Sequence, residues 1–316
     1  MSAISITRPG LLTTVQDLGR WGWQAAGVPV SGVMDRQSSR IANALVGNAP
    51  GAALLEITLA GPQIEFHDDR LIAVAGATFA MDLDGTAVTV NEVIRVRSGS
   101  RLTFGERKAG ARAYFAISGG IETADVLGSR STHLGSAMGG FDGRALKAGD
   151  RLPLGHAAPA RERVRTILDQ VFLTSESNSS KARVRVVSGP ESDRFEKHAL
   201  MEFQSAPYRV GNQSNRMGFR LEGPAVAGPS DIVSDITTMG TLQVPSSGQP
   251  ILLMADRQTT GGYPRIAHVI TADLPKVAQL APGDEMTFTV CTHAEAHDAL
   301  VQSERQLRAL EARPVE

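Results

Sequence analysis

Short apolar runs recur along almost the whole chain and are separated by turn-forming residues. The sequence contains 32 glycines and 16 prolines, which punctuate runs rich in Val, Ile and Thr. This pattern is typical of many short β-strands joined by turns. Because the spacing leaves little room for crossover helices, we expect a mainly β protein, a barrel or a sandwich, instead of a doubly wound parallel sheet. The predicted strands include Ala52–Thr58, Leu71–Ala75, Arg112–Ile117, Arg183–Val187, Ile251–Met254 and Ile266–Ile270.

A glycine turn followed by an alternating strand occurs three times. The stretches are Val96–Phe104, Leu146–Leu154 and Leu280–Phe288, and each has glycine at its fourth position. The pattern indicates either an internal duplication or three unrelated turn-to-strand junctions, which are common in β proteins.

The strand pattern lapses between residues 155 and 182. The polar run Thr174–Ser180 contains too few apolar residues to be buried. We therefore predict an N-terminal β domain over residues 1–155, a linker over 156–181 and a C-terminal β domain over 182–316.

Two stretches predict helices. Residues Ser38–Val46 have amphipathic spacing, and in the tail Thr292 and Glu295 have the spacing of a capping box. We expect the tail helix to lie on the second domain. Its apolar residues, which follow near a 3.6-residue period, are Ala296, Leu300, Leu307 and Leu310.

Charge and cysteine content disfavour several classes of protein. The 32 Lys and Arg residues nearly balance 33 Asp and Glu, which leaves a net charge of −1 and no electrostatic basis for binding nucleic acid or an anionic membrane. Cys291 is the only cysteine, which fits a reducing compartment. The first ten residues lack the basic and apolar regions of a signal peptide, and no stretch approaches the roughly 18 apolar residues that cross a bilayer. We expect a cytoplasmic protein.

Familiar catalytic and ligand motifs are absent from the sequence. There is no P-loop, and the Gly119-Gly120 pair is not part of a Gly-x-Gly-x-x-Gly run. No metal site is predicted, because the histidines form no His-Glu-x-x-His motif and the His293 and His297 pair lacks an apparent third ligand. Cys291 has no evident base beside it and is interpreted as a structural thiol, and no Gly-x-Ser-x-Gly elbow is present.

Three segments are harder to explain as scaffold. In the first, residues 14–35, the side chains of Gln16, Asp17 and Arg20 are clustered among glycines, and loops of that composition often bind a ligand. The alternative is a capped turn in which Asp17 accepts hydrogen bonds from backbone donors and pairs with Arg20.

The second segment, residues 119–144, surrounds Arg130 and Arg144 with small residues. Backbone N–H groups and guanidinium groups there could converge on a carboxylate or a phosphate. Clusters of Ser, Thr and Gly are also typical of β-turns, so an anion site and an ordinary set of turns both remain open.

The third segment, residues 256–264, directly follows the predicted strand Ile251–Met254. It combines a charged pair, Gln258, two threonines, a Gly-Gly pair and Tyr-Pro, a composition typical of a mobile binding loop on a rigid support. Its companion in sequence is residues 214–220, where Arg216 and Arg220 are four apart and would share one face of a strand.

We expect the third segment to border the site. Arg257 and Thr260 would face a bound anion or amide, and Tyr263 would cover it. Gly261 and Gly262 would adopt backbone angles closed to other residues, which would let the loop bend. In the alternative interpretation, Arg257 pairs with its neighbour Asp256 or with another carboxylate and only fixes the end of the strand.

Four runs in these segments resemble the biotin-dependent carboxyltransferase family, also labelled allophanate hydrolase subunit 2 or antagonist of the Kip kinase inhibitor. The resemblance extends from Thr7 to about Phe288, with the motifs in the same order. The runs are Thr14-Val-Gln-Asp-Leu-Gly-Arg20, Leu127-Gly-Ser-Arg-Ser-Thr132, Ser214-Asn-Arg-Met-Gly-Phe-Arg-Leu-Glu-Gly-Pro224 and Ala255-Asp-Arg-Gln-Thr-Thr-Gly-Gly-Tyr-Pro264.

The resemblance implies two cyclophilin-like β-barrel domains. It also implies a part in a heteromeric enzyme, since a free-standing chain of this length resembles the C subunit of ATP-dependent 5-oxoprolinase. In that enzyme the A, B and C subunits together open the lactam of 5-oxo-L-proline to L-glutamate. The implied partners are the B subunit, in a direct complex, the A subunit, and a small lactam or amide substrate. The implied cofactor is ATP with Mg at the level of the complex, bound through a non-Walker site or at the junction with the B subunit.

Two other functions follow from the same resemblance. A carboxyltransferase component of a biotin-dependent urea carboxylase would use carboxybiotin, although the chain has no Ala/Val-Met-Lys-Met biotin-attachment run. A regulatory antagonist would bind a kinase-inhibitor protein. The catalytic residues are not identified. The candidates for binding substrate or nucleotide are Gln16, Asp17, Arg20, Arg130, Arg144, Arg216, Arg220, Arg257, Gln258, Thr260, Gly261, Gly262 and Tyr263.

Overall fold

The computed structural model describes residues 2–157, 180–229 and 232–311. The chain divides into two compact units. Unit 1 comprises Met1–Arg20, Ser31–Ser175 and Arg305–Glu316, and unit 2 comprises Trp21–Val30 and Glu176–Glu304. Most of the predicted linker lies outside the described residues, so the predicted domain boundaries stay a prediction.

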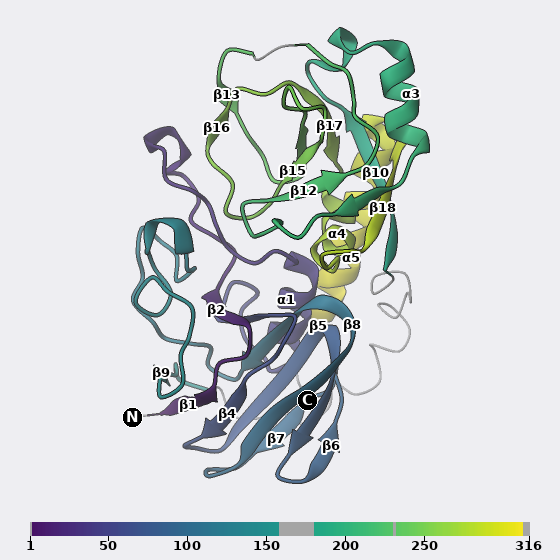
Figure 1. The fold of residues 1–316 in the computed structure, drawn as a ribbon. Coiled ribbons are helices and arrows are strands. Elements are labelled where there is room, and N and C mark those ends of the chain that lie inside the picture. Colours follow the sequence, from purple (N-terminus) through teal and green to yellow (C-terminus); the bar gives the residue numbers. More distant parts are fainter. Residues whose placement is uncertain (1, 158–179, 230–231, 312–316) are drawn as a thin grey trace. The chain divides into compact units, whose positions relative to one another are not determined.

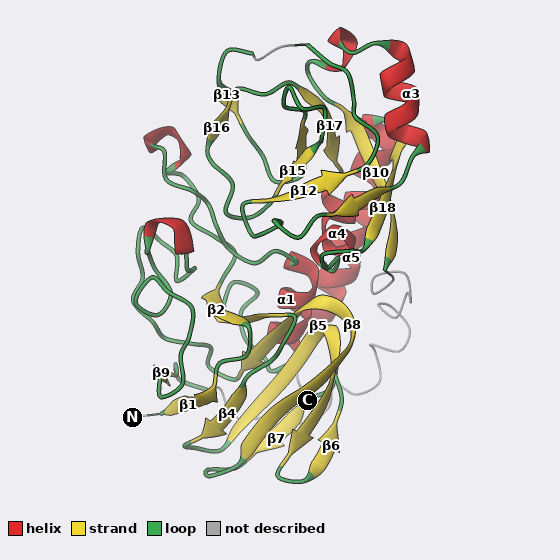
Figure 2. Ribbon diagram, viewed as in Figure 1, coloured by secondary structure: helices red, strands yellow, loops and turns green. Residues whose placement is uncertain are grey.

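Unit 1 is built on a nine-stranded antiparallel sheet that forms a half-barrel (Figure 1). Hydrogen-bonded neighbours follow the order β2-β3-β8-β4-β1-β9, while β5 pairs with β8 and also with β6 and β7. The two longest strands, β5 and β8, lie side by side (Figure 2). The strands are β1 (Ala3–Arg8), β2 (Leu12–Gln16), β3 (Leu54–Thr58), β4 (Gln63–Phe66), β5 (Arg70–Leu83), β6 (Thr86–Val88), β7 (Ile94–Val96), β8 (Arg101–Ile117) and β9 (Arg151–Pro153).

Strands β5 and β8 are buried on both faces where Ile72–Ala75 pairs with Tyr114–Ile117, which explains the unbroken apolar run at residues 113–117. Val74 and Phe115 belong to one core cluster of buried residues. Ala75 and Tyr114, their neighbours along the strands, belong to a second cluster. Because successive side chains of a strand point to opposite faces, a strand covered on both sides does not alternate between polar and apolar residues.

Helix α1 (Arg36–Leu45) packs in the second cluster of unit 1 through residues that include Ile41 and Leu45. The predicted helix over Ser38–Val46 is therefore confirmed. It begins two residues earlier than expected because the Asp35 carboxylate caps it, accepting a hydrogen bond from the Ser38 backbone N–H at 2.9 Å.

Unit 2 is a closed barrel with the strand order β10-β17-β14-β15-β12-β11-β18, completed by a parallel pairing between β10 and β18. A separate two-stranded ribbon pairs β13 (Asp235–Ile236) with β16 (Thr260–Gly261). The predicted mainly β architecture, with a C-terminal helix, is confirmed. The barrel strands are β10 (Lys181–Ser188), β11 (Tyr208–Val210), β12 (Gly218–Glu222), β14 (Thr241–Gln243), β15 (Ile251–Leu253), β17 (Arg265–Val269) and β18 (Glu285–Val290).

An aromatic cluster anchors a helix of unit 2 that the sequence did not predict. Helix α3 (Lys197–Ser205) places Phe203 against Phe288 with ring centroids 4.7 Å apart, and Tyr208 packs beside both rings. Only Ala199 and Phe203 are buried on this helix, so its apolar periodicity is weak. Among the residues that the structure describes, the other short helices are α4 (Leu274–Ala278) and the 3₁₀ turns Gln24–Ala26, Leu134–Ser136, Ser192–Arg194 and Thr271–Asp273.

Helix α5 (His293–Glu311) confirms the predicted tail helix and its capping box. The backbone N–H of Glu295 donates to Thr292 Oγ1 at 3.2 Å, and the Glu295 carboxylate accepts from the Thr292 backbone N–H at 2.7 Å. The expectation that this tail lies on the second domain is wrong for its last turns, because Leu307 and Leu310 are buried in the second core cluster of unit 1.

The three predicted glycine turns form, and all three have the same geometry. Gly99, Gly149 and Gly283 have φ of 86°, 91° and 94°, and no atom lies within 4 Å of a Cβ built on any of them. Glycine is therefore required by the left-handed backbone and not by a lack of space. In each turn the side chain of the next residue, Ser100, Asp150 or Asp284, accepts a hydrogen bond from a backbone N–H three residues before it.

Candidate functional site

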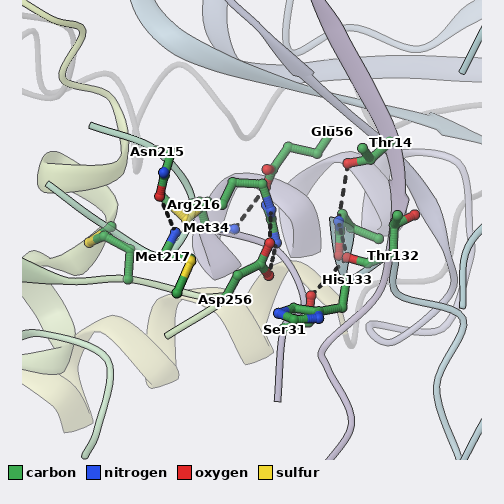
Figure 3. Close-up of polar contacts among 12 residues, drawn as sticks. Thr14, Ser31, Met34, Glu56, Thr132, His133, Asn215, Arg216, Met217 and Asp256 are labelled. Carbon is green, nitrogen blue, oxygen red and sulfur yellow. Dashed lines mark hydrogen bonds and ion pairs between the residues drawn. The ribbon is translucent and has the colours of Figure 1, made fainter. Parts of the chain in front are cut away.

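A buried ion pair joins two of the segments predicted to carry function. Arg216 Nε donates to Asp256 Oδ2 and Arg216 Nη2 donates to Asp256 Oδ1, both at 2.9 Å (Figure 3). Arg216 lies in the turn before β12 and Asp256 follows β15, and the Asp256 backbone N–H donates to the Arg216 carbonyl at 2.8 Å. The pair therefore extends the contact between two adjacent barrel strands.

Arg257, the next residue, is buried but forms no such pair. Its Nη1 donates to the Met254 carbonyl at 3.4 Å, and its Nε has no partner among the residues that the structure describes. Burial lowers the pKa of this guanidinium to about 10, an effect that the nearby Asp256 charge only partly opposes. The alternative interpretation, in which Arg257 pairs directly with Asp256, is wrong because Asp256 binds Arg216.

The rest of the third segment is exposed or half-buried at the surface of unit 2, except for the buried Pro264. Gln258 and Thr260 are exposed, and Tyr263 is 40% exposed. The Gln258 carbonyl accepts a hydrogen bond from Thr237 Oγ1, and Thr260 belongs to β16. Part of the segment is thus a paired strand, and the ligand contacts expected of Thr260 and Tyr263 stay predictions.

The expected role of the two glycines in this segment is wrong. Neither Gly261 nor Gly262 has a positive φ. A Cβ on Gly261 would instead lie 2.5 Å from the side-chain nitrogen of the buried Gln243, which would have to shift, whereas the nearest atoms to a Cβ on Gly262 are 3.5 Å away.

Arg216 and Arg220 do not share one face as expected. A turn in which the Asn215 N–H donates to the Gly218 carbonyl precedes β12, so Arg216 lies outside the strand. Arg216 is 4% exposed, whereas Arg220, within the strand, is exposed.

In unit 1, Asp17 accepts hydrogen bonds from four groups and joins the first and second segments. Its carboxylate accepts from the backbone N–H of Gly19 at 2.8 Å and of Arg130 at 2.6 Å, and from the hydroxyls of Ser129 and Ser131. The interpretation of Asp17 as an acceptor for backbone donors is confirmed. Arg20 is also buried and donates to the carbonyls of Val126 at 2.8 Å and Ser131 at 2.9 Å.

Gln16 lies in a buried polar layer beside these residues. Its Nε2 donates to Thr14 Oγ1 and to the Thr132 carbonyl, both at 3.1 Å. Ser31 Oγ donates to the same carbonyl at 2.8 Å, and Figure 3 labels Thr14, Ser31 and Thr132. The Gln16 Oε1 atom is buried without a partner among the described residues.

Arg130 and Arg144 bind different carboxylates instead of converging on one point. Arg130 Nη2 donates to Glu122 at 2.9 Å, and Arg144 forms a fork with Asp150 at 2.7 and 2.9 Å, which raises the pKa of the guanidinium.

A pocket of about 430 Å³ lies beside these residues in unit 1. Its lining includes the acidic residues Glu122 and Asp142, whereas the sequence pattern around Arg130 and Arg144 predicts only an anion site. The lining residues are Glu122, Thr123, Ala124, Val126, Ala137, Gly139, Gly140, Phe141, Asp142, Gly143 and Pro153.

The described ranges lack two further classes of feature. They contain no group of three or more His, Cys, Asp or Glu side chains that could hold a metal ion. No helix among them is both long and apolar enough to span a bilayer.

Comparison with known proteins gives consistent matches along the chain. The family model described as carboxyltransferase domain, subdomain A and B, matches residues 26–290. The chain is 39% identical to the C subunit of 5-oxoprolinase from Escherichia coli over 97% of both chains. It is 33% identical to urea amidolyase of Saccharomyces cerevisiae, covering 98% of this chain but 18% of that protein.

The solved structures agree with these matches. The crystal structure of Kluyveromyces lactis urea carboxylase superposes with a TM-score of 0.88 at 32% identity, covering 98% of this chain and 29% of that one. This chain therefore spans less than a third of each of the two urea enzymes and nearly all of the Escherichia coli protein.

Proposed function

Because this chain belongs to the carboxyltransferase family, we propose that it is the C subunit of an ATP-dependent 5-oxoprolinase and helps to convert 5-oxo-L-proline to L-glutamate. The observation that carries the proposal is the matching extent of the two chains, because 97% of each is covered in the comparison with the Escherichia coli protein. A second protein of that name, from Haemophilus influenzae, is 35% identical over 90% of this chain and 89% of its own.

In the opening of a lactam, this chain would help to bind and orient the substrate. An unstrained lactam is a poor electrophile, so its opening requires activation, which phosphorylation of the carbonyl oxygen by ATP supplies. Catalysis then depends on positioned cations and backbone donors. The buried Arg257 and the Arg216–Asp256 pair supply a fixed arrangement of charge in unit 2.

The proposed partners and cofactor belong to the assembled enzyme, and no single residue of this chain is assigned to bind them. The B subunit is the direct partner of this chain, the A subunit then completes the enzyme, and the assembly works in the cytoplasm. The described residues offer no group of metal ligands, and Gly119 and Gly120 pack against the main chain at Gly155 and Ala53 instead of opening a helix. ATP with Mg is therefore assigned to the complex as a whole.

Reconstitution tests the proposal. The chain is mixed with the A and B subunits from the same genome, and ATP-dependent formation of glutamate from 5-oxo-L-proline is measured. We expect activity from the three-component mixture and almost none when this chain is omitted or supplied alone. Glutamate formation without this chain, or none from the full mixture, would contradict the proposal.

The second candidate is the carboxyltransferase component of a biotin-dependent urea carboxylase, favoured by the structural match to the Kluyveromyces lactis enzyme. In this case the chain would need a biotinylated carrier and would use carboxybiotin. Transfer of labelled bicarbonate to urea, dependent on this chain, a biotin carboxylase and a biotinylated carrier, would support this candidate and displace the first.

A further inference from the structure

Arginines in this protein repeatedly bind carboxylates through one edge of the guanidinium group. The edge consists of the Nε and Nη2 donors, which match the two oxygens of a carboxylate in a planar fork. Both donors contact one carboxylate group, at 2.6–3.0 Å, in the pairs Arg40–Glu311, Arg185–Asp273, Arg216–Asp256 and Arg265–Glu191.

In Arg257 the same edge has no partner among the residues that the structure describes. The single hydrogen bond of its side chain, to the Met254 carbonyl, comes from Nη1 on the other side of the group. Across the described ranges no acceptor is found for Nε or Nη2, and Nε is shielded from solvent. The residue as a whole is 8% exposed.

The adjacent carboxylate is not available to complete a fork with Arg257. Both oxygens of Asp256 are held by Arg216, and its backbone N–H is held by the Arg216 carbonyl. Burying a cation without a counter-charge is costly, and such a group persists where a ligand supplies the missing charge. The lowered pKa of Arg257 reflects the same burial and still leaves the group charged at neutral pH.

We propose that the Nε and Nη2 edge of Arg257 binds the carboxylate of a small organic acid. The planar edge favours a carboxylate, whose two oxygens it can engage together. If the proposed function holds, the acid is 5-oxo-L-proline. That identification rests on the proposed function, whereas the carboxylate site itself does not.

The first test measures ligand-induced stabilisation of the full chain by thermal melting. The probes are sodium 5-oxo-L-prolinate, sodium cyclopentanecarboxylate, which keeps the carboxylate but lacks the lactam, and 2-pyrrolidinone, which keeps the lactam but lacks the carboxylate. We expect the cyclic carboxylates to raise Tm by roughly 2–5 °C at ten times Kd, because they bind the folded state only. The neutral lactam should leave Tm unchanged.

Matched variants assign that effect to one residue. Arg257→Gln should abolish the carboxylate-dependent shift. Arg183→Gln, which removes the same charge from an exposed position in β10, should retain it. Arg257→Met should melt no lower than wild type without ligand, since it removes a buried charge that the nearby Asp256 compensates only in part. If carboxylates fail to stabilise the wild-type chain, or stabilise Arg257→Gln equally, the inference is overturned.

The second test separates this inference from the proposed function. In the complex with the A and B subunits, Arg257→Gln should raise KM for 5-oxo-L-proline by about 10- to 100-fold with a smaller change in kcat, and Arg257→Lys should recover part of the loss. An active complex with an unchanged KM would refute the carboxylate site and leave the function intact. Carboxylate binding that depends on Arg257, in a chain whose complex does not hydrolyse 5-oxo-L-proline, would refute the function and leave the site intact.

Discussion

Arg216 and Asp256, forty residues apart in the sequence, form a buried two-pronged ion pair with side chains 5% and 4% exposed. The pair fixes the start of β12 to the segment that follows β15. It also occupies both oxygens of Asp256, which leaves the neighbouring Arg257 without a carboxylate partner among the described residues.

Disruption of the Arg216–Asp256 pair should be strongly destabilising. Asp256→Asn removes the carboxylate charge that compensates a buried guanidinium, and we expect the free energy of unfolding to fall by about 3 kcal/mol. The double replacement Arg216→Met with Asp256→Leu should recover much of that loss. Urea denaturation of Arg216→Met, Asp256→Leu and the double variant measures the coupling. If the loss in free energy of unfolding of the double variant equals the sum of the two single losses, the predicted coupling is contradicted.

The glycine turns predict a graded response to substitution at Gly149. Alanine there must adopt a left-handed φ of 91°, so Gly149→Ala should cost about 1 kcal/mol, whereas Gly149→Asn should cost less because asparagine tolerates that region better. Gly51→Ala is the control, since Gly51 has no positive φ and the nearest atom to its Cβ is 3.7 Å away. Equal costs for all three variants in denaturant unfolding would refute the backbone explanation.

Loss of Asp17 should loosen the segment that it anchors. In Asp17→Ala the backbone N–H groups of Gly19 and Arg130 lose their acceptor, and we expect their hydrogen exchange to accelerate by at least about tenfold, which corresponds to about 1.4 kcal/mol. Asp125→Asn is the control, because Asp125 accepts a hydrogen bond from the exposed Gly128 N–H. Exchange at Arg130 that is equally fast in both variants would contradict the prediction.

The Arg265–Glu191 fork predicts an acid-sensitive contribution to stability. Hydrogen bonds from Arg265 hold the pKa of Glu191 below its ordinary value of 4.5. A carboxyl group with a lowered folded-state pKa stabilises the fold above the unfolded-state pKa and loses that contribution as pH falls through the folded-state pKa. Below pH 4.5 the wild type should therefore lose more stability than Glu191→Gln, in unfolding measured over a pH series.

A matched exposed carboxylate serves as the control for that pH series. Lys108 lowers the pKa of Glu106, but both side chains are more than half exposed and screened by solvent. Glu106→Gln should have a stability profile that follows the wild type. A Glu191→Gln profile parallel to wild type below pH 4.5 would show that the fork contributes no acid-dependent stability.

Much of the fold could be predicted from sequence because the relevant signals are local. The strands of both units follow runs of apolar residues, Gly99, Gly149 and Gly283 mark turns by their backbone requirement, and the capping box at Thr292 fixes the start of α5. Helix α3 could not be predicted in this way. Its position depends on one aromatic contact, between Phe203 and Phe288, which are far apart in the sequence.

The site was harder to predict because its contacts join distant segments. The four-residue spacing predicts that Arg216 and Arg220 share one face of a strand. A turn before β12 leaves Arg216 outside the strand, where it is buried, whereas Arg220 lies within the strand and is exposed. Because Arg257 and Asp256 are adjacent in the sequence, a pair between them could be expected. The Asp256 carboxylate instead binds Arg216, forty residues earlier. Gly261 is predicted to allow an unusual φ, but its φ is not positive, and a Cβ there would instead meet the buried Gln243 side chain. No sequence pattern encodes these three relationships.

Unit 1 cannot finish its core early in synthesis, because Leu307 and Leu310 complete it. These side chains leave the ribosome long after Ala116 and Tyr114, the residues of the same cluster on β8. Contacts between positions so distant in the chain close late and slow folding. The nascent protein therefore carries an incompletely covered apolar face while the whole of the second barrel is being made.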